Sequence, residues 1–290
     1  MSMPTLDQRP YAQLIVVCGP PRSGTTWLNR ELCNVPTAFP FLPECTLITQ
    51  QIELYNRTLH SCDPQRFHAY FANQQNLLSY FRANAARLVD QVAILNPKPG
   101  ANTLVLKDPC LCLYLEDIHD VLPPHKLVVL VRDPRDVLAS MKNVTARKKQ
   151  KWNVRKAARE LYKYYNQIGN HQQRADKDSI FLRYEDIVVG QTTILQDFLQ
   201  HKYESIAFAH ADAPSVRDRL DLSDPFFSEL YLQPTTSEKI GSYSKILSVI
   251  EIGYIENVFF GVMEKWSYLS TSPIRTAKRF TKRLLRNLIG

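Results

Sequence analysis

A short segment near the start of the chain has the residue types of an anion-binding turn. The sequence GPPRSGTT, residues Gly19 to Thr26, follows an apolar run and precedes a helix-like pattern. A turn between a strand and a helix directs several backbone N–H groups and the positive end of the helix at one anion. We therefore predict a phosphate-binding loop. The alternative, a purely structural Gly-Pro turn, gives the Arg, Ser and Thr side chains no role.

This loop differs from the nucleoside-triphosphatase pattern at one position. The pattern GxxxxGK[ST] would place a lysine where Thr25 stands, since that lysine binds the outer phosphates beside a metal ion. In this chain the cation is Arg22, inside the turn. A P-loop kinase or triphosphatase is therefore the second enzymatic interpretation rather than the first.

A second candidate anion site follows a later apolar run, Lys126 to Val131. Arg132 comes directly after this run, and Asp133 is typical of a helix start. Ligands bind at the carboxyl ends of the strands in open α/β sheets, where Ser140 could add a hydroxyl to the same anion. Two such elements suit a nucleotide with phosphates at two places. In the competing interpretation, Arg132 pairs with a structural carboxylate such as Asp136.

The elements that position these groups are predicted from the apolar pattern. Short β-branched runs, apolar on both faces, predict buried parallel strands at Gln13 to Cys18, Thr103 to Leu106, Lys126 to Val131 and Ser179 to Leu182. Amphipathic stretches predict helices at Thr46 to Leu59, Gln65 to Leu95, Val154 to Asn170 and Thr193 to Tyr203. We therefore expect a single α/β domain, with a central parallel sheet flanked by helices and a helical C-terminal extension, Ile250 to Gly290.

Composition agrees with a globular protein. Of the 290 residues, 44% are hydrophobic and 22% charged, which excludes a disordered chain or a coiled coil. The apolar stretches are too short to span a bilayer and no secretory leader is found, so a cytoplasmic protein is expected. The six cysteines form no CxxC pair and are expected to be reduced. A zinc site at Cys110 and Cys112 would need an unfavourable one-residue spacer.

The formal net charge of +8 is concentrated in two segments. Residues 147–159 contain seven Lys or Arg and no acid, and residues 275–286 contain six and no acid. Without these segments the chain would have more acidic than basic residues, so we expect no nucleic-acid partner. The tail, 270–290, has the pattern of a basic amphipathic helix, which suits peripheral contact with an anionic membrane surface. Solubility alone is the competing role for both segments.

Taken together, the motifs resemble the sulfotransferase family, which transfers a sulfuryl group from 3'-phosphoadenosine 5'-phosphosulfate (PAPS) to an acceptor. Residues Pro21 to Trp27 are similar to its 5'-phosphosulfate loop, and Val131 to Ser140 to its 3'-phosphate element. Leu182 to Ile187 resembles the segment whose tyrosine contacts adenine. Ile240 to Leu247 resembles the late glycine-aromatic segment that closes over the nucleotide. The resemblance covers residues 12–269, which we take as the sulfotransferase domain, between a flexible start, 1–11, and the basic tail.

The resemblance implies PAPS as the donor and 3'-phosphoadenosine 5'-phosphate (PAP) as a product. By this resemblance Trp27 stacks on adenine, Tyr184 meets the base, and Arg132 with Ser140 binds the 3'-phosphate. No metal is required, because sulfate carries less charge than phosphate. The residues expected to bind the donor are Arg22, Ser23, Gly24, Thr25, Thr26, Trp27, Arg132, Ser140, Tyr184, Ser237 and Lys239.

Sulfuryl transfer needs positive charge on the bridging oxygen and a base on the attacking hydroxyl. Arg22 and Lys107 are the expected cations. Glu44 is the expected base, because it opens a helix a short distance after the loop and should return towards it. The competing role for Glu44 is that of a first-turn acid favoured by the helix dipole. Asp108 is the rival base, and a histidine such as His60 is a weaker candidate.

Two departures bear on the acceptor. The cytosolic branch of the family commonly has lysine where Arg22 stands and a histidine base shortly after a lysine, whereas this chain has Lys107-Asp108-Pro109. It resembles the bacterial, glycan-acting and tyrosylprotein branches more closely. We therefore expect a carbohydrate or glycolipid hydroxyl as acceptor, selected by Thr46 to Leu95 and the basic segment from Arg147. A non-catalytic, nucleotide-binding, membrane-associated protein is the remaining alternative.

Overall fold

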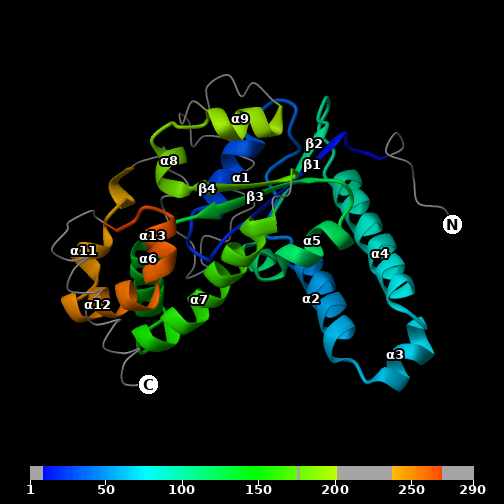
Figure 1. Cartoon of the computed structure of the whole chain (residues 1–290). Coiled ribbons are helices and arrows are strands. Elements are labelled where there is room, and N and C mark those ends of the chain that lie inside the picture. Colours follow the sequence, from blue (N-terminus) through cyan, green and yellow to red (C-terminus); the bar gives the residue numbers. More distant parts are fainter. Residues whose placement is uncertain (1–8, 175–176, 201–236, 270–290) are drawn as a thin grey trace.

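The computed structural model describes residues 9–174, 177–200 and 237–269. A four-stranded parallel sheet with the order β2-β1-β3-β4 forms its centre. Helices cover both faces of the sheet (Figure 1). The predicted α/β class, with a single domain around a parallel sheet, is confirmed. The strands are β1 (Gln13–Cys18), β2 (Thr103–Lys107), β3 (Lys126–Val131) and β4 (Ser179–Arg183).

The helices account for most of the remaining described chain. In order they are α1 (Thr25–Cys33), α2 (Thr46–Ser61), α3 (Pro64–Phe71), α4 (Gln74–Leu95), α5 (Leu115–Val121), α6 (Pro134–Arg147), α7 (Val154–His171), α8 (Tyr184–Val188), α9 (Thr193–Leu199), α11 (Tyr243–Ile246), α12 (Val249–Val258) and α13 (Phe260–Lys265). Short 3₁₀ helices span Pro109–Tyr114, Gln172–Arg174 and Ser237–Lys239.

The alternation of side chains along β1 shows why the strands are apolar on both faces. Ile15 and Val17 lie in one apolar cluster with α1, α8 and α9, whereas Leu14, Val16 and Cys18 lie in the other. The second cluster is completed by α2, α4, α5, α6, α7, α12 and α13. From Leu14 to Cys18, β1 is therefore apolar whichever way a side chain points, as parallel sheets with two covered faces require.

The strand order places the two predicted anion-binding segments together. From β1 the chain crosses to β2 on one side, and it then returns to β3 on the other side of β1. The register pairs Val17 with Lys107 and Cys18 with Val129, so β1, β2 and β3 end at one edge of the sheet. The neighbourhood of β1 and β3 is the switch point at which open α/β sheets bind ligands.

Two predicted helices are shorter or more broken than expected. The helix predicted at Gln65 to Leu95 is two helices, because Ala72 has a φ of 59° and Asn73 caps α4 by accepting the N–H of Asn76. The helix predicted at Thr193 to Tyr203 ends at Leu199, since Gln200 has a left-handed φ of 55°. Both breaks occur at residues other than glycine, so the apolar pattern gave no warning of them.

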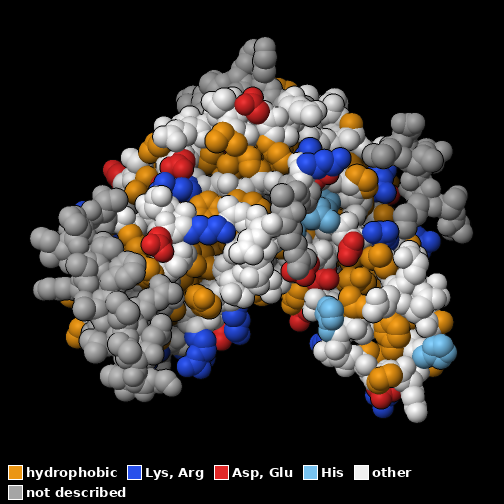
Figure 2. Space-filling view, in the orientation of Figure 1, with side chains coloured by type: hydrophobic (Ala, Val, Ile, Leu, Met, Phe, Trp, Pro, Cys, Tyr) orange, Lys and Arg blue, Asp and Glu red, His pale blue; other side chains and the backbone are white. Residues whose placement is uncertain are grey.

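Helices α2, α3 and α4 form an arm that extends away from the sheet, with α3 at its tip (Figure 1). Aromatic rings line its core, with Tyr55 against Phe81 and Phe67 against Phe71. Figure 2 shows that the surface is indented where this arm leaves the body. Since α2 begins two residues after Glu44, the base of the arm adjoins the candidate site.

The structure also bears on the cysteines, on metal binding and on the membrane. All six cysteines have free thiols; Cys18, Cys33 and Cys112 are buried, whereas Cys62 and Cys110 are exposed. In the described part of the chain, no three His, Cys, Asp or Glu side chains form a group that could hold a metal ion. None of the helices in the described ranges has both the length and the apolar character that crossing a bilayer requires. The predicted basic tail, 270–290, and residues 1–8 lie outside the described residues.

Glu251 attaches the C-terminal helices to the body of the protein. Its carboxylate accepts hydrogen bonds from Lys142 on α6 at 2.8 Å, from the Trp152 indole at 2.6 Å and from the backbone N–H of Ser248 at 2.7 Å. Burial alone would raise the pKa of Glu251, but these hydrogen bonds outweigh it and lower the pKa from 4.5 to about 2. The folded protein therefore favours the ionised carboxylate.

Glu251→Gln is expected to lower the free energy of unfolding at pH 7 by about 1–3 kcal/mol, because charge-assisted hydrogen bonds are lost. Since folding depresses the pKa, the stabilisation is present above pH 4.5 and is lost as the pH falls towards 2. Urea unfolding of both proteins at pH 7 and pH 3 measures the difference. We expect a smaller difference at pH 3, and an equal difference at both pH values would contradict this role of Glu251.

Candidate active site

The loop after β1 has a backbone that few residues can adopt. Gly19 has a φ of 152°, and a Cβ there would lie 2.2 Å from the carbonyl oxygen of Leu130 on β3. Arg22 has a left-handed φ of 72° although it has a side chain, and the N–H of Ser23 closes the turn onto Pro20 at 3.0 Å. Strain at a residue that is not glycine is associated with functional sites.

The loop ends as a cradle at the start of α1. Gly24 is the N-cap of α1 and provides no side-chain cap, so the first N–H groups of the helix have no partner from a capping side chain. The Ser23 hydroxyl is buried and has no hydrogen-bond partner among the described residues. A buried hydroxyl without a partner beside an uncapped helix start suits an anionic ligand.

Gly24→Ala is expected to destabilise the protein by about 1–3 kcal/mol and to weaken anion binding at the loop. Gly24 has a φ of 100°, and an added Cβ would lie 2.6 Å from Cδ2 of the Tyr184 ring. Gly190→Ala is a matched control, because Gly190 has a φ of 91° but no atom within 4 Å of the added Cβ. Urea unfolding and calorimetric titration with PAP measure both effects; equal losses in the two variants would contradict a role for the Tyr184 contact.

Arg132 lies buried at the carboxyl end of β3 and is held by backbone carbonyls. Its Nη1 donates to the carbonyl oxygen of Arg22 at 3.2 Å and its Nη2 to that of Lys239 at 2.9 Å. Its Nε is buried and has no partner among the described residues. Arg132 and Asp136 form no direct ion pair in the described part of the chain: Asp136 accepts the backbone N–H groups of Gly241 and Tyr243, and Arg132 acts on it through charge alone. Within the described part of the chain, these two carbonyls take two of the five N–H bonds of the guanidinium, which leaves three that a ligand could accept.

The two predicted anion-binding segments contact one another. Arg22 Nε donates to the hydroxyl of Ser140 on α6 at 3.2 Å, and Arg132 donates to the backbone of Arg22. The structure thus brings Arg22, Arg132 and Ser140 into one site. The Arg22 side chain, from the loop predicted for the 5' end, thus contacts Ser140, which was predicted for the 3'-phosphate. The spacing of the two motifs along the chain does not predict this contact.

Two aromatic side chains form a wall beside these cations. Trp27 on α1 and Tyr184 on α8 make an edge contact with ring centroids 5.8 Å apart. The Arg132 guanidinium lies over the Tyr184 ring, 4.5 Å from its centroid. Burial raises the pKa of Tyr184, with a smaller opposing effect from Arg132, so the phenol stays protonated.

The two late residues predicted to bind the donor, Ser237 and Lys239, lie in one short turn with exposed side chains. Lys239 reaches the site through its backbone carbonyl, which accepts Nη2 of Arg132. The Ser237 carbonyl accepts the N–H of Ile240 at 2.9 Å and so closes the turn. Donor binding by the two side chains stays a prediction; the contact from this segment to Arg132 is made by a backbone atom.

Lys107 joins the end of the loop after β1 to the predicted base. It is the last residue of β2 and is 3% exposed, and its Nζ donates to Thr26 Oγ1 at 3.1 Å and to Glu44 Oε1 at 2.8 Å. The Glu44 side chain is 50% exposed. An ammonium group buried beside the loop and a carboxylate open to solvent suit a cation and a base.

Glu44 lies outside the helix that it was predicted to open. Helix α2 begins at Thr46 with Cys45 as its N-cap, and the Cys45 N–H donates to the carbonyl oxygen of Lys107 at 2.9 Å. This backbone contact holds Glu44 beside the end of β2. Because Glu44 is not in the first turn of α2, its alternative role as a helix-dipole acid is wrong.

Asp108, the rival base, is committed to the fold. It is 2% exposed, and it accepts the Thr49 hydroxyl at 2.7 Å and the N–H of Cys110 at 2.8 Å. It thereby caps the 3₁₀ helix Pro109–Tyr114. His60, the weaker candidate, lies in the last turn of α2. Among these candidates, Glu44 combines exposure with a contact to Lys107.

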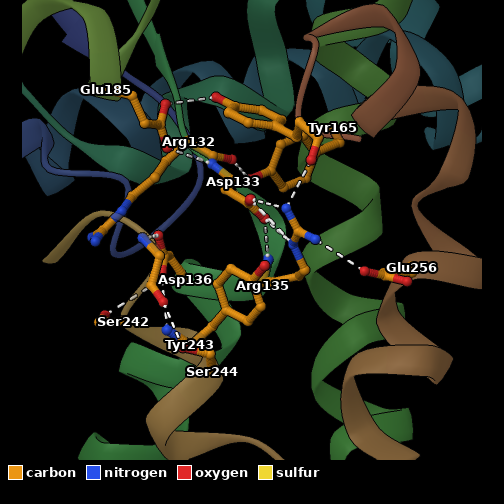
Figure 3. A network of polar contacts seen from close by, with 12 residues as sticks. Arg132, Asp133, Arg135, Asp136, Tyr165, Glu185, Ser242, Tyr243, Ser244 and Glu256 are labelled. Carbon is orange, nitrogen blue, oxygen red and sulfur yellow. Dashed lines mark hydrogen bonds and ion pairs between the residues drawn. The ribbon is translucent and has the colours of Figure 1, made fainter. Parts of the chain in front are cut away.

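A buried polar network contacts the backbone of Arg132 and of the next residue, Asp133 (Figure 3). The Tyr165 hydroxyl of α7 donates to the carbonyl oxygen of Arg132. The N–H of Asp133 donates to Glu185 at 3.0 Å, and Glu185 also accepts the Tyr268 hydroxyl at 2.9 Å. Burial raises the pKa of Glu185, and these two hydrogen bonds oppose the rise. The sequence analysis did not predict that Tyr165 or Glu185 supports Arg132. Glu185 could have been found, because it is an acidic residue directly after the predicted nucleotide contact Tyr184.

Arg135 extends this network to the C-terminal helices. It binds Asp133 at 2.6 Å and Glu256 on α12 at 2.9 Å, and it donates to the carbonyl oxygen of Tyr268 at 2.8 Å. Its guanidinium also lies 4.3 Å from the centre of the Tyr243 ring. Arg135 therefore serves the fold, whereas Arg132 faces the loop.

Comparison with known proteins identifies the family. The family model described as "Sulfotransferase family" matches residues 14–205, more than half of the chain. No curated protein matches. The sulfotransferase domain from the curacin biosynthetic pathway is 19% identical with a TM-score of 0.51, covering 84% of this chain and 96% of that one. The sulfotransferase domain of the Synechococcus PCC 7002 olefin synthase is 15% identical with a TM-score of 0.55, covering 89% and 98%. These two structures share the fold of this chain. Because the family model covers more than half of the residues, the chain belongs to the sulfotransferase family.

Proposed function

We propose that this protein is a PAPS-dependent O-sulfotransferase whose donor site lies at the carboxyl edge of β1, β2 and β3. One observation carries the proposal. Arg132 donates to the backbone of Arg22, and Arg22 donates to Ser140, so both cationic segments serve a single site. A nucleotide with phosphates on two ribose positions requires positive charge at two points of one surface.

The residues present fit such a donor. Two buried polar atoms, Ser23 Oγ and Arg132 Nε, have no partner among the described residues and suit phosphate oxygens. We assign the 5' end to Arg22, Ser23, Gly24, Thr25, Thr26 and the start of α1. Arg132 and Ser140 are assigned to the 3'-phosphate, and Trp27 and Tyr184 to the adenine. PAPS, when bound, supplies the sulfuryl group that is transferred.

The catalytic roles follow from the contacts at the end of β2. Glu44 accepts the proton of the acceptor hydroxyl, and Lys107 fixes the position of this carboxylate through its 2.8 Å contact. Lys107 and Arg22 supply the positive charge that stabilises the leaving bridge oxygen. Because these two cations serve that purpose, we expect transfer without added metal.

The acceptor is proposed to be a carbohydrate or glycolipid hydroxyl. Support comes from the start of α7, where Arg155, Lys156 and Arg159 are exposed and Tyr162 is 42% exposed. Tyr165 on the same helix is buried in the core, so we do not assign it to the acceptor. Exposed cations beside an exposed aromatic ring suit an anionic or sugar ligand.

Transfer of radiolabelled sulfate from PAPS tests this function directly. Glycan, glycolipid, phenol and peptide acceptors are offered separately, and label is expected on the glycan or glycolipid. Label on phenols or peptides alone would contradict the acceptor class but not the reaction. PAP binding without transfer to any acceptor would favour the non-catalytic alternative. The predicted membrane contact of the tail is tested by liposome sedimentation of the full chain.

A further inference from the structure

Asp136 makes contacts that its position in the chain does not explain. It lies in the first turn of α6 and is 2% exposed. Its Oδ2 accepts the N–H of Gly241 at 2.8 Å, and its Oδ1 accepts the N–H of Tyr243 at 2.9 Å and the Ser242 hydroxyl at 3.4 Å (Figure 3). Both carboxylate oxygens therefore accept hydrogen bonds from residues 241–243, which are 105 or more positions further along the chain.

Capping of its own helix does not account for Asp136. Asp133 already caps α6 by accepting the N–H of Arg135 at 2.8 Å. Burial raises the pKa of Asp136, while Arg132 and the N–H groups of Gly241 and Tyr243 oppose the rise. A buried carboxylate costs free energy unless its hydrogen bonds are satisfied, and here the late segment satisfies them.

The segment held by Asp136 ends on Arg132. The turn from Ser237 to Gly241 is closed by the N–H of Ile240, which donates to the Ser237 carbonyl at 2.9 Å, and by the left-handed φ of 72° at Gly241. Within this turn, the carbonyl oxygen of Lys239 accepts Nη2 of Arg132 at 2.9 Å. A continuous set of contacts thus runs from Asp136 through one turn to the guanidinium.

We propose that Asp136 is a positioning residue for donor binding: it holds the Lys239 carbonyl against Arg132 and so orients the guanidinium towards the 3'-phosphate. This inference rests on the proposed function. A guanidinium has five N–H donors in one plane, and two carbonyls at its two Nη atoms fix that plane. Among the described residues, the contacts that would still constrain it without the Lys239 carbonyl are the Arg22 carbonyl and the face of Tyr184.

The test compares a ligand that has the 3'-phosphate with one that lacks it. PAP and 5'-AMP are titrated calorimetrically into the wild type and Asp136→Asn. In this variant the amide oxygen can accept one of the two N–H groups, of Gly241 or Tyr243. The amide NH₂ is a donor and cannot accept the other, so one hydrogen bond to the turn is lost. We expect PAP affinity to fall about tenfold or more, and 5'-AMP affinity to change less than about threefold.

Glu251→Gln is the matched control. Glu251, at the start of α12, also accepts a backbone N–H, that of Ser248, and two side chains, Lys142 and Trp152. None of these contacts involves residues 237–243. It should leave the preference for PAP over 5'-AMP unchanged. Equal losses of PAP and 5'-AMP affinity in Asp136→Asn, or no loss, would overturn the inference. A wild type that does not prefer PAP over 5'-AMP would overturn the proposed 3'-phosphate site itself.

Amide exchange in the wild type tests the same inference if Asp136→Asn does not fold. Saturating PAP should slow exchange of the Gly241 and Tyr243 N–H groups at least about threefold more than saturating 5'-AMP does, because only PAP engages Arg132 through the 3'-phosphate. The Ser248 N–H, which donates to Glu251, is the internal reference. The same exchange rates with both nucleotides would overturn the inference.

Discussion

Glu44→Gln is expected to lower the turnover number for sulfuryl transfer by about 10²- to 10⁴-fold, while PAP affinity changes less than about threefold. The substitution removes the proton acceptor and keeps the shape of the side chain. The buried ammonium of Lys107 loses its ion pair, but it keeps the Thr26 hydroxyl, and the amide oxygen of the substituted side chain can still accept its hydrogen bond. Single-turnover transfer of radiolabel measures the chemical step, and calorimetry measures PAP binding.

Glu160→Gln is the matched control for this experiment. Glu160 is 53% exposed and binds Lys163 at 2.7 Å, close to the 50% exposure of Glu44 and its 2.8 Å contact with Lys107. It should leave turnover unchanged. Turnover of Glu44→Gln within about threefold of the wild type would show that the proton leaves by another route.

Lys107→Met is expected to lower turnover by about 10²- to 10³-fold, because the positive charge that stabilises the leaving oxygen is removed. Methionine fills nearly the same buried volume, so the sheet edge should stay packed. The variant also frees Glu44, which should make the pH dependence of the remaining activity differ from that of the wild type. Turnover against pH, with thermal unfolding as a check on folding, measures these effects.

Lys98→Met separates the role of Lys107 from the general effect of losing a lysine. Lys98 also donates to two protein oxygens, the carbonyls of Val35 at 3.2 Å and Ala38 at 2.8 Å, but it contacts neither the loop nor Glu44. We expect some loss of stability with unchanged turnover. If both variants lost turnover equally, the assignment of Lys107 as a catalytic cation would be wrong.

The fold was predictable because the strands are apolar on both faces, a pattern typical of a parallel sheet that helices cover on each side. The loop was predictable for a similar reason: glycines at 19 and 24 flank an arginine and a serine between a strand and a helix. The break at Ala72 was not predictable, because Ala72 has no residue-type signal for a positive φ of 59°.

The sequence predicted which residues make up the candidate site. It did not predict most of the contacts between them. Glu44 was expected near the loop because the connection after the loop is short. The structure places it 2.8 Å from Lys107, whose Nζ also donates to Thr26 at the start of α1. The contact of Arg22 with Ser140 depends on how α6 leaves β3, which no local pattern encodes. The Lys239 carbonyl and the Asp136 contacts were missed because sequence motifs name side chains, whereas these interactions use backbone atoms.

Thermal unfolding with added nucleotide tests the central claim, that Arg22 and Arg132 bind a nucleotide with phosphates at the 5' and 3' positions of its ribose. PAP at about 100 times its dissociation constant should stabilise the protein by about 2.7 kcal/mol and raise the melting temperature by several degrees, whereas ATP with Mg²⁺ should have little effect. Equal stabilisation by both nucleotides, or stabilisation by ATP with Mg²⁺ alone, would contradict this claim.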